Sequence, residues 1–266
     1  MTTARLTAAG VALTAATAAA GLILEAQAPP ALDKVLYNAA DAIGMLREVE
    51  EEDGIARVEL WGTGTTNVDG QDFTLTKFRA SINYDEPGIR IDFTRAGPDG
   101  KELPREIHVA ARTFAWTEKT PGTGATPANE MAEECLLQVW TTPFGVIKAA
   151  HAAGAKTTIG VEGGATALTI PVGRATLKAW LNGKNLIDRV ETRLGNVVTE
   201  TIYSDYGELN DADYKADVLW PKRITQKRDG VTVLDLTLTR TNTYNPYVIM
   251  PVPENVRKAA PVAPAS

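Results

Sequence analysis

The feature that most constrains the fold is a two-residue alternation of apolar and polar side chains, which recurs in short runs from residue 55 to residue 241. Val58 and Leu60, for example, alternate with Glu59 and Trp61. Runs of this kind, separated by Gly, Pro, Asn and Asp, are typical of antiparallel strands that pair with their sequence neighbours. No strand–helix–strand alternation occurs, so a parallel nucleotide-binding sheet is not expected. The pattern predicts about five strands, at residues 58–65, 78–84, 89–93, 107–111 and 114–116, and then about seven, at residues 157–161, 167–171, 176–181, 186–194, 198–206, 219–228 and 231–241.

Two dipeptides in the second group mark hairpins most strongly. Asn-Gly and Asp-Gly accept the left-handed backbone conformation that a two-residue hairpin turn requires. Asn182-Gly183 and Asp229-Gly230 are therefore expected to form such turns.

Two segments interrupt the alternation with helical spacing. Residues 32–49 carry an apolar stripe at three- and four-residue steps, which predicts an amphipathic helix. A second helix is expected to begin at Asn129 as its cap, to break at Thr142-Pro143 and to stop at Gly154. Because an antiparallel sheet with one apolar face needs a cover on that face, we expect a curved antiparallel sheet wrapped around the N-terminal helix and the broken central helix. The fold class is therefore mainly β (α+β), in one domain at residues 29–257, followed by a disordered tail at residues 258–266.

The first 28 residues differ in kind from the rest. One basic residue, Arg5, precedes an uncharged run at residues 6–24, and the small-residue triplet Ala26-Gln27-Ala28 follows. This order is typical of a secretory signal peptide, with a transmembrane anchor as the alternative. We expect a mature protein that begins near residue 28 and is periplasmic or extracellular.

Charge and composition exclude several kinds of site. The formal net charge is −6, which argues against nucleic acid as a partner. The one cysteine, Cys135, and the two histidines, His108 and His151, cannot build the usual zinc set, so no metal is expected. Cys135 is expected to be buried.

Residues suited to catalysis are equally sparse. The acidic residues at 208–217 lack the spacing of a calcium loop and are interpreted as a solvated turn. Ser204 lies beside Asp205, but no histidine is placed to activate it. We therefore expect no cofactor and assign no catalytic residue; whether the chain is an enzyme stays open, with the balance against it.

Aromatic residues are the candidates for ligand binding. Trp61 and Trp180 fall on the polar faces of their strands, which would expose them as a contact surface for a partner protein. The other candidates are expected on the apolar face of the first half of the sheet or on the helix that covers it. They form either plain core or the wall of a cavity for an apolar ligand. The residues of this set are Phe78, Tyr84, Phe93, Phe114, Trp116, Trp140 and Phe144.

Several motifs together resemble a known bacterial module. Residues 140–150 resemble its W-x-T-P-x-G-x-x-K-A-A helix, and residues 185–192 resemble its N-L-V-x-R-V-E-T strand. Residues 203–206 match its Y-S-D-Y strand, residues 220–239 resemble its closing hairpin, and residues 252–256 match its V-P-x-x-V end. The module precedes the catalytic domain of secreted metallo-β-lactamase-fold hydrolases and is similar to the LolA/LppX group. The resemblance covers roughly residues 31–257.

The resemblance implies a half-open β-barrel whose concave apolar face is partly plugged by helices. It also implies a carrier of acyl chains or lipoproteins, and hence a binding or carrier module for an apolar or amphiphilic small molecule. A second hypothesis is a protein-interaction module that assists a separately encoded metallo-hydrolase. A third is an enzyme with an unrecognised site. The H-x-H-x-D-H motif of the hydrolase domain does not occur in this sequence. The resemblance therefore does not imply hydrolase activity for this chain.

Overall fold

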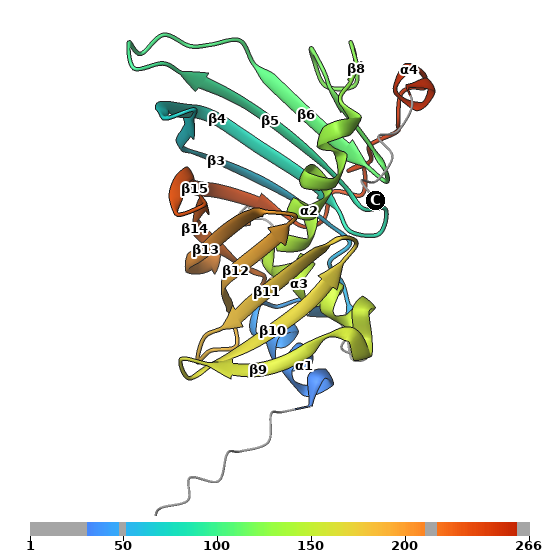
Figure 1. Ribbon diagram of the computed structural model, residues 1–266, viewed down its shortest axis with the longest axis vertical. Coiled ribbons are helices and arrows are strands. Elements are labelled where there is room, and N and C mark those ends of the chain that lie inside the picture. The colour runs from blue at the N-terminus through green and yellow to red at the C-terminus, as the bar shows by residue number, and fades with distance from the viewer. Residues whose placement is uncertain (1–30, 48–51, 211–216, 260–266) are drawn as a thin grey trace, which may run out of the picture.

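A computed structural model of the chain describes residues 31–47, 52–210 and 217–259. Most of these residues belong to one 13-stranded sheet, and all neighbouring strands in it are antiparallel (Figure 1). The mainly β, curved antiparallel fold predicted from the alternation is thus confirmed. Two short strands, β1 (Leu46–Arg47) and β2 (Glu52–Asp53), pair only with each other. The strands of the large sheet are β3 (Arg57–Val68), β4 (Gln71–Asn83), β5 (Gly88–Ala96), β6 (Glu106–Ala111), β7 (Phe114–Thr117), β8 (Thr126–Pro127), β9 (Thr158–Glu162), β10 (Ala165–Val172), β11 (Ala175–Leu181), β12 (Ile187–Leu194), β13 (Val197–Glu208), β14 (Leu219–Arg228) and β15 (Val231–Asn242).

The strand order joins the two halves of the sequence through one long-range pair. The order is β8-β7-β6-β5-β4-β3-β15-β14-β13-β12-β11-β10-β9, so β3 pairs with β15 in the middle of the sheet. Every other neighbour is also a sequence neighbour, as expected for a meander. The edges of the sheet are β8 and β9, which are not paired with each other in the described structure.

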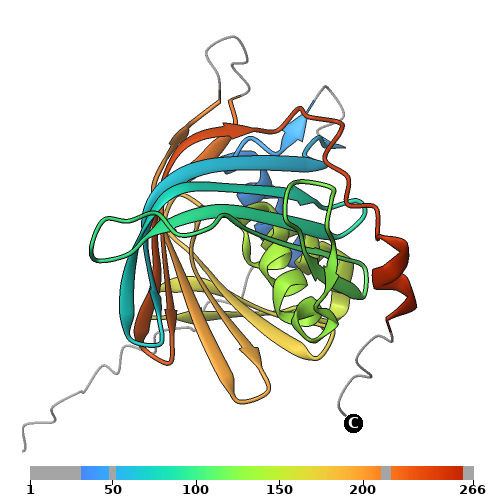
Figure 2. The ribbon, with the colours of Figure 1, turned by 90° about the horizontal axis from the view of Figure 1, so that it is seen from above.

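Bulges near the centre of the sheet produce its curvature. The register shifts between Gly62 and Gly64 on β3, between Leu75 and Lys77 on β4, and next to Leu238 on β15. A bulge bends its strand and increases the local twist. Three shifts on adjacent strands therefore curl the sheet around the helices (Figure 2).

The helices fill part of the concave side. They are α1 (Leu32–Ala42), α2 (Ala132–Thr141) and α3 (Pro143–Ala153), with single 3₁₀ turns before α2 and after α3. Helix α2 contacts β5, β6 and β7 on one side and β12 on the other, so it bridges the two halves of the sheet. Helix α3 packs against α1, α2 and β10 (Figure 2). None of the helices in the described part of the chain is long and apolar enough to cross a membrane.

The break between α2 and α3 is fixed by hydrogen bonds. Thr142 Oγ1 accepts from the Gly145 N–H at 3.0 Å and donates to the Val139 carbonyl at 2.9 Å. The Tyr84 hydroxyl, 2.8 Å away, is left to donate to Thr142 Oγ1, and Tyr203 donates to the Thr141 carbonyl at 2.7 Å. Each half of the sheet thus contributes one tyrosine to hold the break.

Three local predictions were wrong. Helix α1 ends at Ala42 because Gly44 adopts a left-handed φ of 71°, and β1 follows; residues 48–51 lie outside the described residues. Asn129 is not a helix cap, because its Oδ1 accepts the Ala115 N–H of β7 at 3.0 Å. Asn182-Gly183 does lie in a hairpin between β11 and β12, but the connection is longer than two residues, and Asn185 rather than Gly183 takes the left-handed conformation.

The expected termini fall largely outside the described part. The predicted signal peptide at 1–28 lies outside the described residues. Lys258 ends a short helix, α4 (Glu254–Lys258), and residues 260–266 of the predicted tail are not described.

A C-terminal strap at residues 243–259 runs across the outer face of the sheet. Asn83 Nδ2 donates to the Val248 carbonyl at 2.9 Å, and Asn245 Nδ2 donates to Glu59 Oε2 at 2.7 Å. Glu59 also accepts from Arg79 at 2.5 Å and from Ser81 at 3.1 Å. Burial opposes ionisation of Glu59, but these hydrogen bonds and the charge of Arg79 outweigh it and lower the pKa of this carboxyl below its ordinary value.

Glu59→Gln is expected to destabilise the protein in a pH-dependent way. A lowered folded-state pKa contributes stability above the unfolded-state pKa, and this contribution is lost as the pH falls through the folded-state pKa. The variant should be less stable than the wild type by about 1–3 kcal/mol at pH 7. The difference should shrink below about pH 4.5, the ordinary pKa. Urea unfolding from pH 7 to pH 3 measures it, with Glu254→Gln on α4 as an exposed control; a difference that does not change with pH contradicts the assignment.

Candidate functional site

Two of the aromatic candidates form solid core. Phe144, at the start of α3, is fully buried, and its ring lies 5.0 Å from the Trp220 ring and 6.5 Å from the Tyr84 ring. Both contacts are edge-on, which is a favourable geometry for aromatic pairs. The interior at the helix break is therefore filled by side chains.

Phe114 and Trp116 lie on the opposite side of the sheet from the helices. The expectation that they share the helix-facing side with the other aromatics was wrong. Trp116 packs in a second, outer cluster with Val109 of β6 and with Val248 and Val256 of the strap. The strap covers the outer face there, so β6 and β7 are apolar on both faces and alternation cannot distinguish the two. The other members of this cluster are Ile107, Ala111 and Met250, with Phe114 at its margin.

Trp116 is also held by a buried polar network. Its Nε1 donates to Glu118 Oε1 at 2.8 Å. Glu118 accepts from Arg90 Nη2 at 3.2 Å and from the Gly122 N–H at 2.7 Å as well. The carboxylate therefore has its charge compensated, as a buried charge requires, and this part of the outer face is a structural anchor.

The remaining sheet aromatics belong to a half-buried surface on the concave side. Phe78 and Phe93 are directly opposite each other on β4 and β5. Their side chains pack against the main core but remain partly exposed. We call this surface the concave patch and define it as Phe78, Ile91, Phe93, Ile224 and Leu234.

Charged side chains border the concave patch near β5 and β6. The Arg95 guanidinium lies 5.4 Å from the centre of the Phe93 ring and forms an ion pair with Glu106. The His108 ring lies 5.5 Å from the Phe93 ring, so His108 also faces the concave side. Burial lowers the pKa of His108, and the Glu106 charge only partly offsets this effect.

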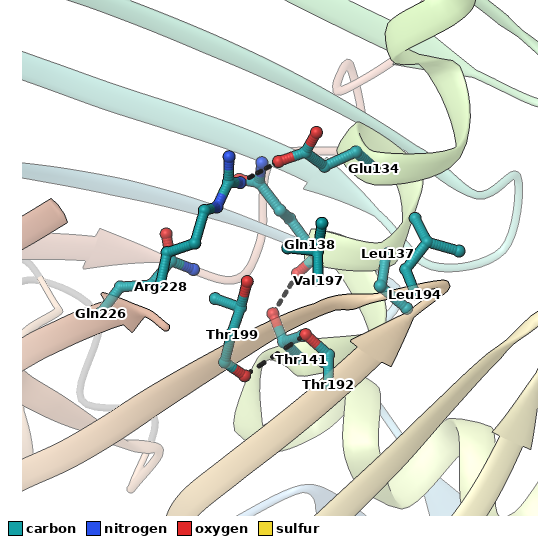
Figure 3. A pocket seen from close by; sticks show the side chains of 10 residues that line it. All are labelled: Glu134, Leu137, Gln138, Thr141, Thr192, Leu194, Val197, Thr199, Gln226 and Arg228. Carbon is teal, nitrogen blue, oxygen red and sulfur yellow. Dashed lines mark hydrogen bonds and ion pairs between the residues drawn. The ribbon is translucent and has the colours of Figure 1, made fainter. Parts of the chain in front are cut away.

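A small pocket lies between α2 and the second half of the sheet (Figure 3). Its volume is about 90 Å³, which is small beside the several hundred Å³ of an ordinary ligand site. An ion pair between Glu134 of α2 and Arg228 of β14 lies at one side of it (Figure 3). The other lining residues are Leu137, Gln138, Thr141, Thr192, Leu194, Val197, Thr199 and Gln226.

A larger groove follows the unclosed side of the barrel, where α2 and α3 face β10 and β11. Trp140 lies half-buried at its centre, between two connected parts of about 530 and 350 Å³. We call it the seam groove. Its apolar lining comes from Leu136 and Trp140 of α2, Ala149, Ala152 and Ala153 of α3, and Pro171 and Val172 of β10.

A third groove, of about 700 Å³, separates α1 from α3. Tyr37 of α1 and Met45 lie on one side of it, and Lys148 and His151 lie on the other. Lys148 is paired with Asp53, and His151 is exposed. Sequence periodicity could not reveal this groove. The apolar residues that line it belong to the same helical stripe as the residues that pack the helices together, so the two roles have the same spacing.

The proposed outer contact residues are less open than expected. Trp180 is only 6% exposed, because the Arg189 guanidinium lies 3.7 Å from its ring centre and Lys178 lies 5.3 Å from it. Trp61 is half-buried, with the Arg240 guanidinium 3.9 Å from its ring centre. The prediction of an exposed Trp180 was wrong, since cationic side chains from the same and neighbouring strands stack on such rings.

Groups suited to metal binding or nucleophilic chemistry are not assembled in the described part of the chain. No cluster of three or more His, Cys, Asp or Glu side chains occurs among these residues. Cys135 is buried, as predicted, and burial together with the Glu134 charge raises the pKa of its thiol to about 11. It is therefore a poor nucleophile at neutral pH. Part of the acidic loop at 208–217 lies outside the described residues.

Neither a protein-family model nor a curated protein matches this chain. The LolA/LppX resemblance of the sequence motifs therefore stays a prediction. Two of these motifs do have a clear local role. Thr142 and Gly145 form the break between α2 and α3, and Tyr203 anchors it.

Proposed function

We propose that this chain is a binding or carrier protein for an apolar or amphiphilic small molecule, whose apolar part packs on the concave patch. The observation that supports the proposal best is the half-buried state of Phe78, Ile91 and Phe93 on a curved, unclosed sheet. Large apolar side chains on a concave surface are typical of ligand sites. The LolA/LppX resemblance and the predicted signal peptide support a carrier that works in the periplasm or outside the cell.

The energetics suit an alkyl chain better than a compact polar ligand. Burial of each CH₂ group contributes about 0.8 kcal/mol. A micromolar dissociation constant corresponds to roughly 8 kcal/mol, so about ten buried methylenes provide this gross amount before the losses of association. The ion pairs Arg95–Glu106 and Arg228–Glu134 could interact with a polar head group at the edges of the concave side.

Phe93→Gln is expected to weaken binding of a fluorescent long-chain fatty acid by about tenfold or more, because it places an amide among the apolar patch residues. The matched control is Ile202→Gln, which changes a half-buried apolar residue of β13 outside the patch. Equilibrium titration of both variants and the wild type measures the effect. The proposal fails if the wild type binds no probe, or if the two variants lose affinity equally while both stay folded.

A second candidate is a protein-interaction module, and exposed side chains of the strap favour it. Tyr247 is 82% exposed and Ile249 is 58% exposed, with Tyr244 close by in the sequence. Exposed apolar side chains that gather in one segment are typical of contact surfaces. Native mass spectrometry of the protein purified from its own compartment separates the candidates: a small added mass supports the carrier, and a co-purified protein supports the interaction module.

A further inference from the structure

A polar cluster borders one end of the concave patch, and it consists of Arg95, Glu106 and His108. Side chains at alternate positions of a strand share one face, so Arg95 follows Phe93 along the concave side of β5. On β6, Glu106 is directly opposite Phe93, and His108 is directly opposite Ile91. The cluster therefore lies next to the apolar side chains on which the proposed ligand packs.

The guanidinium of Arg95 is held in a largely apolar setting. Its side chain is only 16% exposed, and the guanidinium carbon lies 5.1 Å from the centre of the Phe73 ring and 5.4 Å from that of the Phe93 ring. Nη2 donates to Glu106 Oε1, but Nε is buried without a hydrogen-bond partner among the described residues. A guanidinium has five N–H donors, so Arg95 has more donors than Glu106 can accept from.

The other ion pair at the edge of the concave side is much more open to solvent. Arg228 is 46% exposed and Glu134 is 55% exposed. Charges attract more strongly where water is excluded, and exposed ion pairs contribute little. Of the two arginines, Arg95 is therefore the better placed to bind a charged head group.

His108 gives the cluster a means to compensate a second negative charge. Its Nε2 atom lies 3.7 Å from Glu106 Oε2. Burial lowers the pKa of His108, the Glu106 charge raises it, and the Arg95 charge lowers it again. The imidazole is therefore neutral at pH 7 and can take up a proton when an anion arrives beside Arg95.

The elements packed around His108 bring no further unpaired charge to it in the described part of the chain. Thr117 lies opposite it on β7, and Ile91 lies opposite it on β5. Helix α2 also packs against β6 and has two acidic residues. These acidic residues form ion pairs elsewhere, Glu133 with Arg174 and Glu134 with Arg228.

We propose that the ligand of the concave patch carries an anionic head group, which Arg95 binds while the alkyl chain runs over Phe93 and Phe78. The inference rests on the proposed function and adds the ligand class, a long-chain amphiphile with a carboxylate or phosphate head. A guanidinium binds the oxygens of either group through paired N–H donors. His108 takes up a proton from solvent on binding, so two positive charges then face two negative ones.

Calorimetric titrations with dodecanesulfonate and dodecanol separate the head group from the alkyl chain, which the two compounds share. The wild type should bind the sulfonate about tenfold or more tightly than the alcohol. Arg95→Gln should remove this preference and keep the affinity for the alcohol. The matched control is Arg223→Gln, which changes an arginine that is paired with Asp235 and follows the opposite face of β14 from Ile224. Laurate and dodecyl phosphate, compared at pH 8, then distinguish a carboxylate from a phosphate.

An NMR titration of the histidine rings detects the same event without a variant in the cluster. His108 and His151 are the two histidines of the chain, and His151→Gln at an exposed position assigns their signals. Saturating dodecanesulfonate should raise the pKa of His108 by about 1 pH unit or more, because an opposite charge arrives nearby. Dodecanol should not raise it, and neither compound should change the titration of His151.

The outcomes keep this inference separate from the proposed function. Equal affinity of the wild type for both compounds, or a preference that a folded Arg95→Gln retains, overturns the head-group assignment and leaves the carrier proposal standing. A preference lost only in Arg228→Gln, or a titration changed only at His151, places the head group elsewhere and also overturns it. If Arg95→Gln does not fold, the His108 titration of the wild type decides. If neither compound binds, the proposed function fails and this inference fails with it.

Discussion

Phe144→Ala is expected to lower the free energy of unfolding by about 3–5 kcal/mol, the usual cost of removing a fully packed aromatic side chain. The ring of Phe144 is fully buried between Tyr84 and Trp220. Its removal also leaves a cavity where α3 begins, next to the hydrogen bonds that fix the helix break. Urea unfolding measures the loss.

The matched control is Trp140→Ala on the preceding helix, whose side chain is half-buried in the seam groove. It has fewer contacts to lose, so its cost should be clearly smaller. If Phe144→Ala costs less than about 1.5 kcal/mol, the residue lines a void and not the core, because truncation of a packed aromatic costs at least twice that amount.

Gly64→Ala is expected to cost at least 2 kcal/mol, at the upper end of the usual range for overpacking. A Cβ atom at this position would lie 2.0 Å from the Asp235 carbonyl oxygen and 2.9 Å from the Leu236 Cα atom. Both belong to the backbone of β15, which cannot move away without disturbing the central strand pair. Thermal or urea unfolding of the variant measures the cost.

Gly160→Ala on edge strand β9 is the control, because no atom lies within 4 Å of the Cβ atom it would introduce. Its effect should stay within about 0.5 kcal/mol. Equal effects of the two substitutions would contradict the assignment of Gly64 to a close contact between strands that the curvature of the sheet requires.

Alternation and turn residues predicted most of the strands, because side chains on one face of an antiparallel sheet recur every second residue. The break at Thr142 was also predictable, since proline at the first position of a helix has a fixed backbone angle. The pairing of β3 with β15 was not, because local patterns contain no information on contacts between segments far apart in the sequence.

The candidate site was predicted less well than the fold. Trp116 was assigned to the wrong side of its strand, since the strap that covers the outer face contributes Val248 and Val256 from far along the chain. Phe144 and Phe93 look alike in the sequence, yet one is fully buried and the other half-buried. The two residues differ in how deeply their side chains are buried on the concave side. That burial depends on how α2 packs across the two halves of the sheet, which the local sequence does not encode.

The most direct test of the account follows the isoleucine methyl groups by NMR during a titration with oleate. Ile91 and Ile224 lie on the concave patch, Ile170 and Ile187 are fully buried in the core, and Ile202 is a half-buried residue of β13 outside the patch. Ligand on the patch should shift the Ile91 and Ile224 signals and leave the other three in place. Shifts confined to Ile202, or no shift at Ile91 and Ile224 at saturating oleate, would contradict the claim that the concave patch is the binding surface.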